Sequence, residues 1–106
     1  MSDQSPVPAE LISAFDAAAR DIVELGNRLI DADASADLWE VSAGLLSGAV
    51  HFWLYAHQPC NEFGCEACVE IDTAEKRMKM LLAELRQAAE TSEYYHSPQD
   101  SNVGRA

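Results

Sequence analysis

The residues of this chain best suited to chemistry lie between positions 57 and 68. This segment reads His-Gln-Pro-Cys-Asn-Glu-Phe-Gly-Cys-Glu-Ala-Cys, the pattern H-x2-C-x4-C-x2-C. A spacing of two residues lets a pair of side chains reach one ion from a tight turn, and three thiolates with one imidazole form the donor set of closed structural zinc sites. The pattern therefore predicts zinc ligands at His57, Cys60, Cys65 and Cys68.

The fourth ligand is predicted to be His57 because the other histidines lie too far away. His51 is six residues earlier, about 9 Å back along the same helix, and is expected to be a hydrogen-bonded core histidine. His96 is expected at the opposite end of the next helix. The oxygen alternatives are Glu62, Glu66 and Asp72.

The cysteines are compatible with other chemistries as well. The run from Cys60 through Cys65 to Cys68 resembles the C-x4-C-x2-C segment of plant-type ferredoxins, over nine residues and without their fourth cysteine. That resemblance implies an iron–sulfur cluster. Thiol redox or sulfur-handling chemistry at the same three residues is a further alternative to zinc.

The composition limits the classes of partner. Lys and Arg number 7 against 18 Asp and Glu, so the formal net charge is −11. Such a charge repels phosphate backbones and anionic lipid headgroups, which argues against nucleic acid or a membrane surface as a partner. A weaker alternative is that the charge mimics nucleic acid. The chain has no Gly-rich phosphate loop and no serine in a nucleophile elbow, which favours a protein that is not an enzyme.

The cellular compartment is predicted from the N-terminus and the cysteine count. Residues 1–10 contain no Lys or Arg and no apolar core of a signal peptide. The longest weakly polar stretch, residues 41–56, is shorter than the roughly 18 apolar residues of a membrane-spanning helix. Three cysteines leave at least one thiol unpaired. We therefore expect a cytoplasmic protein with free or metal-bound thiols.

Three helices must position the cysteine segment. Apolar residues at alternating steps of three and four predict helices over residues 8–32 and 72–95, the first with Pro8 in its opening turn. A second helix is expected to begin at Ser35 as N-cap. Asp72 and Glu75 have the spacing of a capping box at the start of the third helix. No segment alternates with period two, so no sheet is expected.

The predicted fold is all-α, an antiparallel three-helix bundle with a Cys-rich loop at residues 59–71 between the second and third helices. A single helical domain would span residues 8–96, between a disordered N-terminus at 1–7 and a disordered polar tail at 97–106. The second helix carries two apolar stripes together with Gly44 and Gly48, which predicts a homodimer centred on it.

Three cations, Lys76, Arg77 and Lys79, lie at the start of the third helix, where the helix dipole disfavours positive charge. Either they stabilise neighbouring thiolates or they form an ordinary solvated face. Taken together, the sequence predicts a small acidic cytoplasmic helical protein that binds structural zinc in a Cys/His loop and serves as a protein-interaction or regulatory module.

Overall fold

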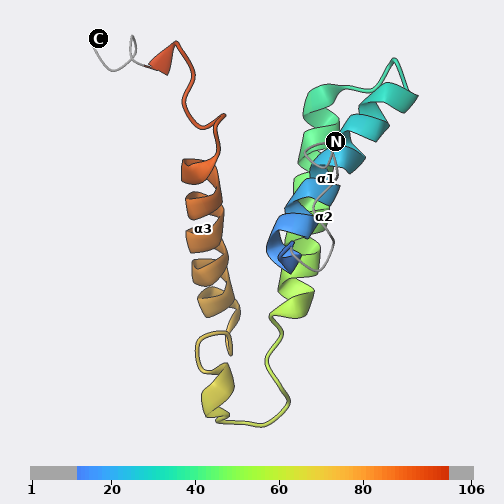
Figure 1. Cartoon of the computed structure of the whole chain (residues 1–106). Coiled ribbons are helices and arrows are strands. Elements are labelled where there is room, and N and C mark those ends of the chain that lie inside the picture. Colours follow the sequence, from blue (N-terminus) through green and yellow to red (C-terminus); the bar gives the residue numbers. More distant parts are fainter. Residues whose placement is uncertain (1–11, 101–106) are drawn as a thin grey trace. The chain divides into compact units, whose positions relative to one another are not determined.

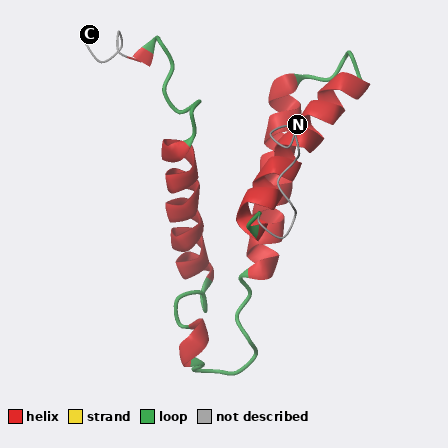
Figure 2. Ribbon diagram, viewed as in Figure 1, coloured by secondary structure: helices red, strands yellow, loops and turns green. Residues whose placement is uncertain are grey.

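The computed structural model describes residues 12–100, which form helices and loops without a strand (Figure 2). The elements are α1 (Ala14–Ala32), α2 (Leu38–Ala56), the short 3-10 helix η3 (Glu66–Cys68) and α3 (Ala74–Thr91) (Figure 1). The all-α prediction is confirmed, while the antiparallel bundle stays a prediction. Within the described residues, no helix combines the length and apolar character needed to cross a membrane.

The contacts within the chain divide it into two units, one ending at His51 and the other beginning at Phe52. The first contains α1 and most of α2. The second contains the end of α2, the cysteine loop and α3. The single domain proposed for residues 8–96 stays a prediction. The predicted disordered N-terminus at 1–7 lies outside the described residues, as does the predicted disordered tail at 97–106 apart from residues 97–100, where Ser97 and Asp100 hydrogen-bond with each other.

The first helix begins later than its apolar pattern predicts. Ser13 adopts an extended conformation, and its side-chain oxygen accepts a hydrogen bond of 3.0 Å from the amide of Asp16. A hydroxyl in this position satisfies an amide that has no partner inside the helix. The helix therefore starts at Ala14 and not in the neighbourhood of Pro8, which lies outside the described residues.

The predicted cap of the second helix is wrong by two residues. The Ser35 amide and hydroxyl both donate to the Asp33 carboxylate, at 3.0 and 2.7 Å. These bonds, that of the hydroxyl foremost, hold the pKa of Asp33 below its usual value. Because Ser35 is engaged in the turn, Asp37 accepts from the amide of Trp39 at 3.2 Å at the start of α2.

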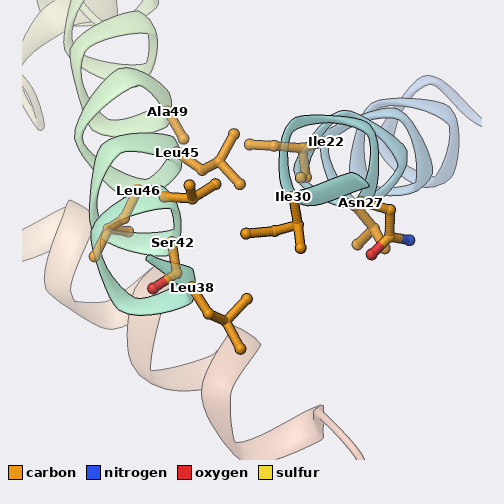
Figure 3. Close-up of a pocket in the computed structure, with 11 residues that line it drawn as sticks. Ile22, Asn27, Ile30, Leu38, Ser42, Leu45, Leu46 and Ala49 are labelled. Atoms are coloured by element: carbon orange, nitrogen blue, oxygen red, sulfur yellow. The ribbon is translucent and has the colours of Figure 1, made fainter. Parts of the chain in front are cut away.

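A shallow apolar groove lies between α1 and α2 in the first unit. Figure 3 shows Ile22 and Ile30 of α1 directed toward Leu45 of α2 across it. The two helices approach closely at Gly26, where an added Cβ would lie 3.0 Å from Leu45 Cδ1. No side chain of either helix is fully buried. The groove, of about 320 Å³, is therefore open along its apolar walls.

The third helix is capped by Thr73 instead of the predicted Asp72. The Thr73 hydroxyl accepts from the amide of Lys76 at 3.1 Å, and Asp72 pairs with the ammonium of Lys76 at 2.9 Å. The predicted capping box with Glu75 is not formed. The helix ends at Thr91, four residues before the predicted end at residue 95. Leu81 is the one buried side chain among residues 12–100, with 6% of its surface exposed.

Candidate metal centre

The cysteine loop is a folded connection between α2 and α3 within the second unit (Figure 1). Gly64 lies between Cys60 and Cys65 with a φ of 77°, a left-handed conformation that favours glycine. Cys65 then precedes η3 and Cys68 ends it, with the Cys68 amide donating to the Cys65 carbonyl at 3.2 Å. The glycine turn and the single helical turn thus fold the segment back toward Cys60.

The fold brings the three predicted cysteine ligands together. The sulfur atoms of Cys60, Cys65 and Cys68 all lie within 4.8 Å of one another, and all three thiols are free. The amide of Cys60 donates to Cys68 Sγ at 3.3 Å, which links the two ends of the cluster. Zn–S bonds of about 2.3 Å require sulfurs roughly 3.8 Å apart in a tetrahedron. Small side-chain adjustments would therefore let the three sulfurs share one ion.

The three thiols differ in how readily they ionise. The Cys60 thiol, the Ala67 amide and then the Cys68 thiol and amide hydrogen-bond with Cys65 and lower its pKa. The Cys60 amide favours the Cys68 thiolate. This effect of the Cys60 amide is outweighed, so the pKa of Cys68 is raised. The opposing causes are hydrogen bonding with the Cys60 thiol, desolvation, hydrogen bonding with Cys65 and the charge of Cys60. Cys65 is therefore the first of these two thiols to present a thiolate.

The structure does not gather His57 into the group of converging ligand atoms. Its ring stacks on Trp53 with the ring centroids 3.6 Å apart and the planes 11° from parallel. Its Nδ1 lies 2.7 Å from the Trp53 carbonyl oxygen, as a donor. Donation from Nδ1 leaves Nε2 with a free lone pair, the form in which histidine binds metals.

The remaining sequence candidates also lie outside the group. His51 is exposed, so the expectation of a core histidine is wrong. His96 Nδ1 lies 3.6 Å from the Asp100 carboxylate. Glu62 and Asp72 line a hollow of about 530 Å³ beside the three cysteines, without joining the sulfur cluster.

Trp53, near the end of α2, makes two contacts that the sequence analysis did not predict, one with Glu84 and one with His57. Trp53 Nε1 donates to Glu84 Oε1 at 3.0 Å, which connects the end of α2 to α3. The separation of Trp53 and His57 by four residues on one helix was the available signal for their contact, because residues four apart share a helix face. The histidine and the tryptophan therefore form a stacked pair at the end of α2, where the chain enters the cysteine loop.

The cations at the start of α3 bind the loop backbone. Lys76 Nζ donates to the carbonyl of Val69 and Arg77 donates to the carbonyl of Ile71, each at 2.8 Å. These bonds, together with the pairing of Lys76 with Asp72, offset the unfavourable position of the cations near the helix N-terminus. Lys76 and Arg77 therefore bind carbonyls and a carboxylate in place of the thiolates considered from the sequence.

The arrangement can hold a soft or borderline cation through three sulfurs on a short loop that is hydrogen-bonded to α3. No protein family, curated protein or solved structure that was compared with this chain matches it. The chemistry of the site must therefore be argued from its own residues.

Proposed function

We propose that this protein is a metal-binding module in which Cys60, Cys65 and Cys68 bind zinc, with His57 as fourth ligand. The observation that carries the proposal is the convergence of all three sulfurs within 4.8 Å. Thiolate-rich sets of this kind form structural zinc sites. The proposal places the protein in the cytoplasm, where reducing conditions keep thiols available for metal.

Several features of the loop support this role. The segment from residue 57 to residue 73 holds its shape through a glycine turn, a single 3-10 turn and bonds from Lys76 and Arg77. A bound ion would link Cys60 to Cys65 and Cys68 and would stabilise the folded state. Among the described residues of the second unit, Leu81 is the one buried side chain, so this stabilisation would be large relative to the contribution of the core.

The case for His57 rests on its tautomer and position. Its Nδ1 donates to the Trp53 carbonyl, so Nε2 is free to bind metal. The residue precedes Cys60 by three positions, at the point where α2 passes into the loop. To bind the ion shared by the sulfurs, the ring would have to leave its stacked position on Trp53. Zinc binding by this route has to replace the ring stack with a metal bond.

The decisive experiment is a metal analysis of the purified full chain followed by a competition titration with a chromogenic chelator. We expect about one zinc ion per chain and a loss of tight binding in Cys65→Ser. His57→Ala should bind zinc at least about tenfold more weakly, whereas His51→Ala, an exposed histidine on the same helix, should match the parent. Iron with inorganic sulfide would instead indicate a cluster.

A second candidate is a dithiol redox role for Cys65 and Cys68, favoured by their opposite pKa shifts. The Cys65 thiolate would attack a small disulfide and release one thiolate. The Cys68 thiol, on losing its proton, would then attack Cys65 and release the second. Overall, two protein thiols are oxidised and one disulfide is reduced. Metal-free protein that forms this bond reversibly with glutathione disulfide would favour redox over zinc.

For the interaction role, we propose that α2 associates with a second copy of the chain. The helix contains one charged residue, Glu40, among 19, in a chain of net charge −11. Two acidic copies therefore meet with least repulsion along α2. Leu38, Trp39 and Leu46 expose 63%, 83% and 54% of their surfaces there. Large exposed apolar side chains on a helix with one charged residue favour an interaction site there.

Two glycines of α2 also support self-association. An added Cβ at Gly44 or Gly48 would meet nothing within 4 Å in this chain. Each glycine costs a helix about 1 kcal/mol relative to alanine, and no intrachain contact requires it. A second helix passing close to these positions would account for both. Light scattering should give twice the chain mass, and Gly48→Leu should reduce it, whereas Ala89→Leu on exposed α3 should not.

A further inference from the structure

The three cysteine sulfurs supply every ligand of a three-coordinate ion but only three of the four ligands of a four-coordinate ion. Three sulfurs converge, while His57 is engaged with Trp53 through its Nδ1 and its ring face. Zinc in a structural site takes four ligands, so it must recruit His57, a water molecule or a carboxylate. An ion that takes three sulfurs and nothing else requires no such recruitment.

We propose that Cys60, Cys65 and Cys68 form a site for a three-coordinate thiophilic ion, with trivalent arsenic as its closest chemical match and Cu(I) as the competing source of the same sulfur chemistry. The inference rests on the proposed function, since it takes for granted that the three thiols bind one ion. It goes further by assigning the site a preference for ions that need no fourth ligand. Soft thiolate sets favour soft ions over harder ones.

Access to the sulfurs is consistent with this ligand. Cys60 is exposed, Cys65 and Cys68 are half-buried, and all three line the hollow beside the loop. The hollow also carries Glu62 and Asp72, which would repel an anion. Arsenous acid is uncharged at neutral pH, so the acidic surroundings do not oppose its entry.

The binding reaction balances without an oxidant. One As(OH)₃ reacts with three cysteine thiols, three As–O bonds break and three As–S bonds form. Each thiol proton leaves with a hydroxide as water, giving three water molecules. Arsenic stays trivalent and every sulfur keeps its oxidation state.

The test compares arsenite with zinc on the reduced full-length chain, using native mass spectrometry for stoichiometry and competition titrations for affinity. The parent should bind one arsenic with loss of all three reactive thiols. His57→Ala should keep its arsenic affinity within about threefold while its zinc affinity falls at least about tenfold. Cys60→Ser should lose about a hundredfold in arsenic affinity, the upper range expected when one metal-binding interaction is removed.

Four outcomes would overturn the inference. A thiol that stays reactive in the arsenic complex would show a two-sulfur site, and an equal loss of arsenic and zinc affinity in His57→Ala would show that the histidine belongs to both. X-ray absorption that finds three sulfurs around Cu(I), with no arsenite binding, would assign the site to copper instead of arsenic. Zinc bound tightly without arsenite would refute this inference alone, whereas a chain that binds neither would refute the proposed function.

Discussion

Substitution of Trp53 by leucine tests whether zinc must draw His57 away from its stacked position. The two rings lie 3.6 Å apart and nearly parallel. Aromatic pairs contribute about 0.5 to 1.5 kcal/mol beyond the area that they bury. The Nδ1 bond to the backbone carbonyl of residue 53 is kept in the variant, so the stack is the contact with His57 that the variant removes.

The expected effect on zinc affinity follows from that free energy. If binding breaks the stack, Trp53→Leu removes this cost, and zinc affinity should rise about 2-fold to about 12-fold, since about 1.4 kcal/mol corresponds to a factor of ten. Arsenite affinity should stay the same because the three sulfurs do not depend on His57. Both affinities can be measured by competition titration against a chromogenic chelator or a dithiol.

A control is needed because Trp53 also donates to Glu84 at 3.0 Å. Glu84→Met removes this hydrogen bond and keeps the stack, so its zinc affinity should match the parent. Trp53→Phe keeps an aromatic ring and should fall between the parent and Trp53→Leu. If zinc affinity falls or stays constant in Trp53→Leu while Glu84→Met matches the parent, zinc binding does not have to break the stack of His57 on Trp53.

Four further outcomes are expected. Leu81→Ala should lower the free energy of unfolding by about 2 to 5 kcal/mol, and Leu82→Ala, 56% exposed in the parent, by less than half as much, both measured by urea denaturation. Arg77→Met removes the donor to the Ile71 carbonyl and should speed amide exchange in the cysteine loop while α1 keeps its protection. Because its pKa is lowered, Cys65 should react with iodoacetamide at lower pH than Cys68, whose pKa is raised, with peptide mass spectrometry giving the order. Gly44→Ala should stabilise the dilute chain by up to about 1 kcal/mol and weaken association, and a variant that strengthens association would contradict close packing at this position.

The helix interiors and the end of α1 at Ala32 could be predicted from the sequence, but the residues at which the helices begin could not. Apolar spacing locates α1, α2 and α3 because each repeats with the period of a helix. The caps were misplaced because a neighbouring side chain competes for the same donors or acceptors. Ser35 donates to Asp33 and leaves Asp37 to cap α2, and Asp72 pairs with a lysine and leaves Thr73 to cap α3.

Part of the candidate site could likewise be predicted from the sequence, and part could not. The spacing of the cysteines was sufficient to predict that their sulfurs meet, because the glycine turn and the 3-10 turn are local. The position of His57 depends on Trp53 one turn earlier, and a metal-ligand pattern contains no information about a competing aromatic neighbour. The cations of α3 were noticed for their unfavourable place in the dipole, but their partners are loop carbonyls that are identified only once the loop is folded.

Because few of the described side chains are buried, ion binding and association, if they occur as proposed, would contribute to the free energy of folding. Most of the stability of a helix in a protein comes from packing of its apolar face and not from its own helix propensity. Neither α1 nor α2 buries a side chain fully, and α2 carries two glycines that lower its own helix stability. Association would supply the missing burial to the first unit, and an ion at the sulfurs would supply stability to the second. The unfolding midpoint should therefore rise with both protein concentration and bound metal, since a ligand that binds the folded state stabilises it by mass action.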